Sequence, residues 1–228
     1  MSQEKIDMVK TFLQGAHYVD LSHKLSSKMS AFFGQQPFKM TLAVSKEKDG
    51  TPFIHSNVAF NEHTGTHMDA PSHFYFPLSI DNINPAQMIG RAAVINRPGQ
   101  LTATKADVLA WEKENGDIEE GDYVLFGFGW AQYFNTEKFA STPWPGLTAD
   151  AAEYLVGKKV KGLGVDTLTL DVSTDTEYSC HQIALKNNVL IIENLNNLEK
   201  LPAWCLFACL PLPFENGTAS PVRPIAVF

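Results

Sequence analysis

The chain has 228 residues, 44% of them hydrophobic, which is enough for one large domain to bury a core without disulfides or a structural metal. Its formal net charge of −7 comes from acidic and basic residues scattered along the sequence with no lysine- and arginine-rich block, so nucleic acid is not an expected partner. No segment approaches the roughly 18 consecutive apolar residues of a membrane span, and the three cysteines form no Cys-x-x-Cys pair, so we expect a cytoplasmic protein with reduced thiols and no membrane partner.

The N-terminal segment has the pattern of an amphipathic helix. Within residues 1–15, Ile6, Val9 and Leu13 recur at helical spacing among charged neighbours. The segment lacks the continuous apolar stretch and the small-residue cleavage site of an export signal. We therefore expect a helical extension over residues 1–17, followed by a single domain over residues 18–228.

Strand and helix patterns alternate along the rest of the chain. Short apolar or alternating runs predict strands at 38–44, 53–60, 92–96, 123–128, 162–166 and 189–192. Helical patterns predict helices at about 104–114, 148–156 and 177–186. Thr104 and Asp107 form a capping-box pattern at the start of the first helix, and Cys205 and Cys209 are expected on one face of a further buried strand. The expected class is mixed α/β, with a mixed sheet and packed helices.

One short segment concentrates residues that bind metals. Three imidazoles and one carboxylate fall within the eleven residues from His63 to His73. Borderline divalent metals such as Zn²⁺ and Mn²⁺ take imidazole nitrogen and carboxylate oxygen, and an open catalytic site commonly has three protein ligands plus water. His63, His67 and Asp69 can supply these three ligands. The alternative from composition alone is a polar surface loop with solvated histidines.

The residues between the first two histidines argue against a helix. Thr64, Gly65 and Thr66 have low helix propensity, so His63 and His67 are not expected to share a helix face. We expect the ligands to converge from a strand end and the loop that follows it, which places the metal at the rim of a sheet.

The same segment resembles the signature of the cyclase family of metal-dependent hydrolases, which includes bacterial kynurenine formamidases and isatin hydrolases. That signature reads H-x-G-T-H-x-D-x-P-x-H, and the chain has every specified position between His63 and His73. Weaker similarities occur elsewhere in the chain, in the same order as in the family, at 20–22, 145–147, 164–171, 193–195 and 223–226. The resemblance, which covers the chain from about residue 18, implies a swivelling β/β/α fold and a homodimer or homotetramer.

The resemblance also implies a centre with one or two divalent ions, Zn or Mn. In the formamidase branch this centre can be binuclear, and the matching positions in the second half are His181 and Glu193. Asp69 and Glu193 would then bridge the ions, with His181 as a ligand of the second ion. Glu193 ends a buried apolar run, where an ionised carboxylate needs a partner. From the residues alone, a helix histidine and a carboxylate exposed past a strand end remain the alternative.

His73 resembles the family's general acid/base, with a further metal ligand as its alternative role. An imidazole can take a proton from metal-bound water and return it to a leaving nitrogen. The resemblance therefore implies hydrolysis of an amide-like C–N bond other than a peptide bond, by metal-bound hydroxide. N-formyl-kynurenine is the first substrate to consider, and a cyclic amide, imide or lactone such as isatin is the second. A non-catalytic metal-binding member of the family is the third reading.

Two positions depart from the family's usual pattern. Phe128 precedes Gly129-Trp130 where many members have threonine, so a hydroxyl that could reach the substrate is missing. Near the N-terminus, Phe32 takes the place of the family's substrate-contacting aromatic residue. Other aromatic residues lie close in sequence to the site segments, namely Phe33, Phe74, Phe76, Trp130, Tyr133 and Trp144. We therefore expect an apolar or aromatic pocket for a small-molecule substrate.

Overall fold

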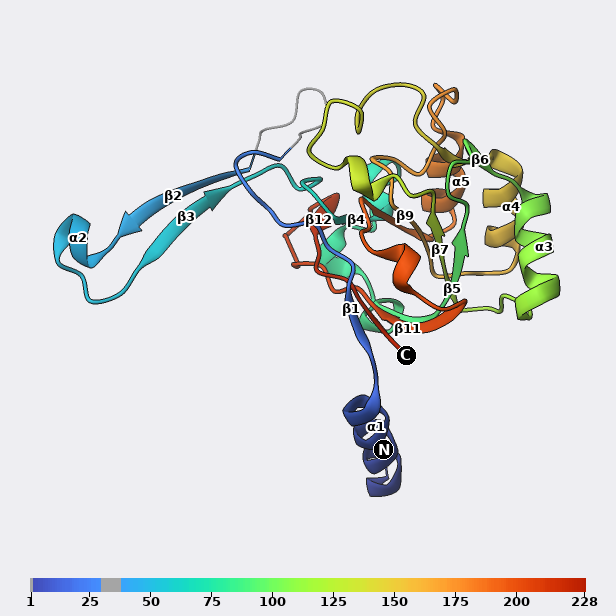
Figure 1. Ribbon diagram of the computed structural model, residues 1–228, viewed down its shortest axis with the longest axis horizontal. Helices are drawn as coiled ribbons and strands as arrows, with labels where there is room; N and C mark the ends of the chain where they lie inside the picture. The colour runs from blue at the N-terminus through green and yellow to red at the C-terminus, as the bar shows by residue number, and fades with distance from the viewer. Residues whose placement is uncertain (1, 30–37) are drawn as a thin grey trace.

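A nine-stranded mixed sheet forms the centre of the molecule in a computed structural model, which describes residues 2–29 and 38–228 (Figure 1). The strands lie in the order β1-β13-β11-β5-β7-β9-β10-β4-β12. Their bounds are β1 (Tyr18–Asp20), β13 (Ile225–Val227), β11 (Trp204–Ala208), β5 (Ile89–Asn96), β7 (Tyr123–Gly127), β9 (Gly162–Val165), β10 (Leu190–Glu193), β4 (His67–Asp69) and β12 (Ala219–Pro221). The four strands from β5 to β10 are parallel, and the pairs toward both edges are antiparallel.

Three helices cover one face of this sheet. They are α3 (Lys105–Asn115), α4 (Ala149–Gly157) and α5 (Ser179–Lys186), and each connects two adjacent parallel strands. Crossovers of the same hand place consecutive helices on the same side, and Figure 1 shows the three side by side. A short parallel pair, β6 (Thr102–Ala103) with β8 (Gly146–Leu147), lies beside them. The mixed α/β class expected from the sequence is confirmed.

The sheet separates two apolar cores. Along β7, Val124 and Phe126 face the helices, whereas Tyr123 and Leu125 face the opposite core, as alternation along a strand requires. The second core contains the buried side chains Leu21, Met68, Ile192 and Phe207. Short 3₁₀ turns lie in two connections between strands. The turns η2 (Ile80–Asn82) and η3 (Pro85–Gln87) connect β4 to β5, and η5 (Leu198–Lys200) connects β10 to β11.

Most predicted elements are present with small shifts in their ends. The predicted strands correspond to β2 (Lys39–Val44), β3 (His55–Ala59), β5, β7, β9 and β10, and the predicted helices correspond to α3, α4 and α5. The capping box between Thr104 and Asp107 has both of its hydrogen bonds. Cys205 lies in β11 and Cys209 one residue beyond it, both buried in the same core. The strands β1, β4, β12 and β13 were not predicted because three residues are too few to show alternation.

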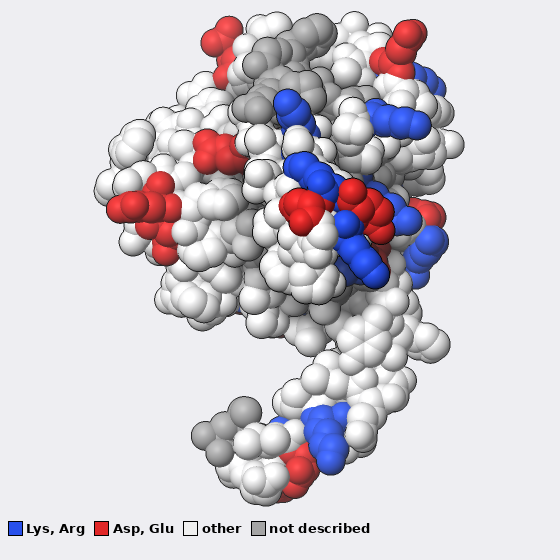
Figure 2. Space-filling model, turned by 90° about the vertical axis from the view of Figure 1, so that its left-hand side faces the viewer, with Lys and Arg blue, Asp and Glu red and all other residues white. Residues whose placement is uncertain are grey.

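Two elements project from the body of the molecule. The predicted N-terminal helix is present as α1 (Gln3–Gly15), but none of its residues is buried. Strands β2 (Lys39–Val44) and β3 (His55–Ala59) form a hairpin whose connection contains the short helix α2 (Lys46–Asp49). Figure 1 shows this hairpin and α1 extending in different directions, and Figure 2 shows α1 standing clear of the body. Among the described residues, no helix combines the length and the apolar character that crossing a membrane requires.

Candidate metal centre

The middle of the histidine-rich motif forms β4, which pairs with β10 on one side and β12 on the other. Because side chains alternate along a strand, His67 and Asp69 point to the helix-covered face, and Met68 points into the opposite core. Glu193 ends β10 as the register partner of His67 and therefore shares its face. The strand arrangement thus brings residues 67, 69 and 193 together, one strand from the sheet edge, close to the rim expected from the sequence.

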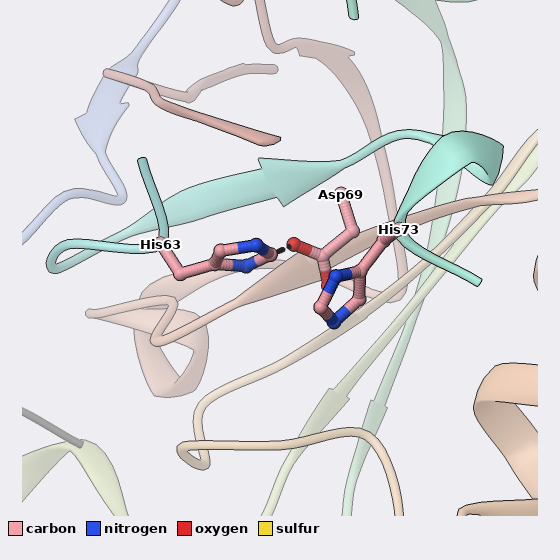
Figure 3. A group of neighbouring side chains, drawn as sticks. All are labelled: His63, Asp69 and His73. Atoms are coloured by element: carbon pink, nitrogen blue, oxygen red, sulfur yellow. Dashed lines mark ion pairs between the residues drawn. The ribbon is translucent and has the colours of Figure 1, made fainter. Parts of the chain in front are cut away.

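His63 and His73 lie in the loops on either side of β4, and their side chains approach the group formed by residues 67, 69 and 193. Gly65 has a φ of +66°, and a Cβ there would lie 2.7 Å from a leucine side chain, so this turn requires glycine. After β4, the 3₁₀ turn η1 (Pro71–His73) brings the chain back toward the strand. The ring centroids of His63 and His73 are 4.3 Å apart, and Figure 3 shows both rings beside Asp69.

Two carboxylates lie among the inward nitrogens of three imidazoles. One oxygen of Asp69 is 2.9 Å from His63 Nδ1 and 3.5 Å from His67 Nε2, and the other is 3.6 Å from His181 Nε2. The oxygens of Glu193 lie 3.3 Å from His67 Nε2 and 3.3 Å from His181 Nε2. Asp69 and Glu193 therefore both lie between the histidines of the motif and the histidine supplied by α5.

The outward nitrogens of two of these rings have hydrogen-bond acceptors. His67 Nδ1 is 2.8 Å from the carbonyl oxygen of Gly65, which can only accept. His181 Nδ1 is 2.5 Å from a carboxylate oxygen of Asp171. Each ring therefore donates outward through Nδ1 and presents Nε2 to the carboxylates. Histidines that bind metals characteristically donate their second N–H in this way.

The charges of the cluster strongly perturb its protonation. Burial opposes the charged form of His67, but Asp69 and Glu193 outweigh it and raise the pKa of His67 to about 9. Burial likewise opposes a charged His181, yet neighbouring carboxylates raise its pKa well above the usual range. The same attractions outweigh burial at Asp69 and Glu193 and lower the pKa of both carboxyls. The carboxylates thus attract positive charge, which protons or a metal cation can provide, and metal binding would release the protons.

Among these residues, Asp69 most clearly indicates a site for a cation. Both of its oxygens are buried, and none of the described residues donates a well-aligned hydrogen bond to either oxygen. A buried carboxylate in this state is costly unless a cation or a donor compensates it. Its neighbours form two overlapping groups in which the ligand atoms lie within 4.8 Å of one another, namely His63–Asp69–His73 and His67–Asp69–Glu193. Nitrogen and carboxylate donors at this spacing fit a divalent ion such as Zn²⁺ or Mn²⁺.

The structure brings all the predicted ligands and the predicted acid/base into this one cluster. They are His63, His67, Asp69, His73, His181 and Glu193. Their roles remain predictions, and the grouping of His73 with His63 and Asp69 keeps the ligand alternative for His73 open. Phe32, the predicted substrate contact, lies outside the described residues, as does Phe33.

A cavity of about 450 Å³ opens above the cluster. Four aromatic side chains line it, namely Phe74, Phe134, Phe139 and Tyr178, together with aliphatic and polar residues. His73 remains accessible to solvent, but partial desolvation by its surroundings, together with the neighbouring histidines, lowers its pKa despite the opposing pull of Asp69. Among the described residues that line the cavity, none is lysine or arginine.

The pocket is aromatic, as expected, but most of the aromatic residues that line it among the described parts of the chain differ from those predicted. Of the candidates near the motif, Phe74 lines the cavity, whereas Phe76 is 78% exposed and does not. Phe134 and Phe139 enter from the loop after β7, and Tyr178 precedes α5 at a positive φ of 55°. No local sequence pattern marked these three residues, because loop conformation brings them to the site.

Phe128 has a structural role rather than a place in the cavity. Its side chain is 3% exposed and packs in the core between the helices and the sheet. Its backbone N–H donates to the buried carboxylate of Asp166, which also accepts from the N–H of Trp130. Phe128 therefore contributes to core packing directly after the end of β7.

Comparisons with known proteins agree with this geometry. The chain matches the family model described as "Putative cyclase" over residues 19–172. It is 30% identical over 204 residues to an isatin hydrolase of Roseibium aggregatum, covering 79% of this chain and 77% of that protein. It is 26% identical to a kynurenine formamidase of Bacillus cytotoxicus, covering 93% and 98%. The structure of isatin hydrolase A from Labrenzia aggregata bound to benzyl benzoate superposes with a TM-score of 0.91 at 26% identity, covering 99% of each chain.

Proposed function

Because the chain belongs to the cyclase family, we propose that it is a metal-dependent hydrolase that cleaves an amide-like C–N bond in a small molecule. The observation that carries the proposal is the buried Asp69 carboxylate, which lies among three imidazoles at the floor of the cavity. Hydrolase activity in similar proteins named isatin hydrolase and kynurenine formamidase supports the proposal.

His63, His67 and Asp69 would hold one divalent ion. His181, with Asp69 and Glu193 shared, would hold a second ion if the centre is binuclear. When bound, such an ion polarises the carbonyl of the substrate and makes water a stronger acid. The chain's own contribution is to fix the ligands on β4, β10 and α5 and to surround them with aromatic side chains that exclude bulk water.

His73 is the group best placed to move a proton. Its ring is exposed beside the ligands, and its lowered pKa keeps the ring neutral, and therefore able to accept a proton, at neutral pH. A proton taken there from water can be returned to the leaving nitrogen. This exposed ring also favours a hydrolase over a non-catalytic metal-binding protein, since a closed structural site has no use for a free base.

The cavity favours a compact uncharged aromatic amide over an amino-acid derivative. N-formyl-kynurenine carries an α-carboxylate, which a lysine or arginine would normally bind, and isatin carries no charge. Neither lysine nor arginine occurs among the described cavity-lining residues, and the undescribed segment 30–37 also contains neither. A cyclic amide such as isatin, the second substrate considered from the sequence, is therefore the candidate that this feature of the site supports.

A substrate panel tests the proposal directly. Protein stripped with a chelator and reloaded with Zn²⁺ or Mn²⁺ should hydrolyse at least one of isatin, N-formyl-kynurenine and simple lactams, and metal-free protein should hydrolyse none. Hydrolysis by rigorously metal-free protein would contradict metal dependence. Tight metal binding without turnover of any amide would favour the non-catalytic alternative.

We further propose that the protein is a homodimer or homotetramer in solution. The exposed apolar side chains on the two projecting elements support this, including Met8 on α1 and Ile54 and Val58 in the hairpin. An isolated two-stranded hairpin is marginally stable in water, so packing against a second copy would stabilise it. Light scattering coupled to gel filtration should give a mass of two or four chains, and a monomer would contradict the proposal.

A further inference from the structure

His63 has an outward contact that differs from those of the other two histidines. Its Nε2 lies 3.3 Å from the hydroxyl of Thr218, which directly precedes β12. The Thr218 hydroxyl donates to one carboxylate oxygen of Glu62 at 2.5 Å, and the Thr218 backbone N–H donates to the other at 3.0 Å. Glu62 is thus held on both oxygens by a residue 156 positions away in the sequence.

The directions of these hydrogen bonds follow from counting protons. A threonine hydroxyl has one proton and two lone pairs. Because Thr218 gives its proton to Glu62, its oxygen can only accept from His63, so Nε2 must carry the N–H. In a neutral ring this leaves a lone pair on Nδ1, the nitrogen that lies 2.9 Å from Asp69.

We propose that Glu62 and Thr218 are positioning residues that fix the tautomer of His63 so that Nδ1 is free to bind the metal. The proposal rests on the proposed function, because it assigns both residues to the metal centre of that hydrolase. Neither residue touches the inward ligand atoms. They act through the outer nitrogen of His63, as acceptors beyond the ligands do in metal sites generally.

The need for two residues has a chemical reason. The acceptor for His67 is a carbonyl and the acceptor for His181 is a carboxylate, and neither group can donate. A hydroxyl can donate as readily as it accepts, so Thr218 alone would allow either tautomer of His63. Glu62 removes this ambiguity by taking the hydroxyl proton.

The proposal predicts different effects for two nearly isosteric changes. Thr218→Val removes the hydroxyl and leaves the outer N–H of His63 without its acceptor. Glu62→Gln offers an amide N–H that can donate to the Thr218 oxygen, which turns the hydroxyl toward His63 and places the ring proton on Nδ1. Thr218→Ser keeps the hydroxyl and is the matched control.

Zn²⁺ affinity, measured by competition with a chromophoric chelator, gives the first readout. Thr218→Val and Glu62→Gln should weaken binding about 10- to 100-fold, and Thr218→Ser should stay within about threefold of wild type. Thermal denaturation of the metal-free proteins serves to separate misfolding from altered ligand chemistry. Equal affinity for wild type and Thr218→Val, or equal losses in Thr218→Val and Thr218→Ser, would overturn the proposal.

Nitrogen-15 NMR of histidine-labelled, metal-free protein gives a second readout that does not depend on metal binding. His63 signals, assigned by their loss in His63→Asn, should show the Nε2–H tautomer in wild type and Thr218→Ser, and a shift toward Nδ1–H in Glu62→Gln. A neutral wild-type ring protonated on Nδ1 would refute the relay. If wild type shows the expected tautomer but binds no divalent metal, the proposed function fails and the hydrogen-bond relay stands.

Discussion

The carboxylate of Asp171 joins His181 to the backbone at the start of α5. One oxygen lies 2.5 Å from His181 Nδ1, and the other accepts the N–H of Cys180 at 2.6 Å. The chain at Gly146 packs directly on the backbone of Asp171, where a Cβ would come within 2.4 Å of its carbonyl carbon. Asp171 is therefore fixed from three directions, and it fixes the ring that α5 contributes to the centre.

Asp171→Asn should weaken divalent-metal binding about 10- to 100-fold. The amide can keep its acceptor toward Cys180, but its NH₂ group then faces His181 Nδ1 and favours a proton on Nε2, the nitrogen needed for the metal. Competition with a chelator measures the loss. Asp175→Asn is the matched control, because Asp175 accepts backbone N–H groups near the same helix end without touching His181. Similar losses in both variants would contradict the interpretation.

His67→Ala should remove most of the bound metal. His67 lies within 3.5 Å of both carboxylates through Nε2, and its loss removes one of the three ligands that would hold the first ion. Elemental analysis of the purified protein, with His55→Ala on the exposed hairpin as control, measures the metal content. Metal content equal to wild type would exclude His67 as a ligand.

Glu193→Gln and His181→Ala should impair catalysis more than folding. Glutamine keeps the oxygen that accepts the N–H of Leu170 at 2.8 Å but loses the negative charge between two imidazoles. Thermal melts in the presence of metal should remain close to wild type while kcat/KM falls. An unfolded Glu193→Gln protein whose folded fraction keeps full activity would show that the carboxylate is structural.

His73→Ala should retain its metal and lose at least about 10²-fold in hydrolytic rate, as expected for a general acid/base. Because the pKa of His73 is lowered, the wild-type rate should fall only when the pH drops below the usual histidine range and the ring becomes protonated. The variant should lack this lower limb of the pH–rate profile. Loss of metal instead would assign His73 to the ligands.

The contribution of His67 and Glu193 to the stability of the metal-free protein should be greatest in mildly acidic solution. His67 titrates at 6.5 when unfolded and at about 9 when folded, so its contribution is complete below pH 6.5 and is lost as the pH rises toward 9. The pKa of Glu193 is lowered from 4.5, so its contribution is present above pH 4.5 and is lost as the pH falls. The loss of stability caused by His67→Ala, measured by urea denaturation in a chelator, should therefore be greatest between pH 4.5 and 6.5. A loss that stays the same from pH 6 to 9 would contradict the raised pKa of folded His67.

The ligands could be predicted from the sequence because their chemistry is concentrated in one motif, and the resemblance added His181 and Glu193. The residues around them could not be predicted in the same way. Thr218 is 155 positions from His63 in the sequence. The pairing of β4 with β12 brings the segments that precede these two strands together. Phe134 and Phe139 depend on the path of an irregular loop. Local patterns and the resemblance therefore predicted most of the elements and the residues of the cluster, whereas tertiary pairing determines the supporting residues.

The position of β4 in the sheet has a consequence for the order of folding. Both of its neighbours, β10 and β12, come more than a hundred residues later in the chain. During synthesis, the motif leaves the ribosome well before Glu193 and Thr218 exist, and contacts so distant in sequence form late. A nascent chain that ends just before β10 would carry all four histidines of the cluster without the strand that gathers them. We therefore expect stable metal capture to report completion of the fold rather than to guide its beginning.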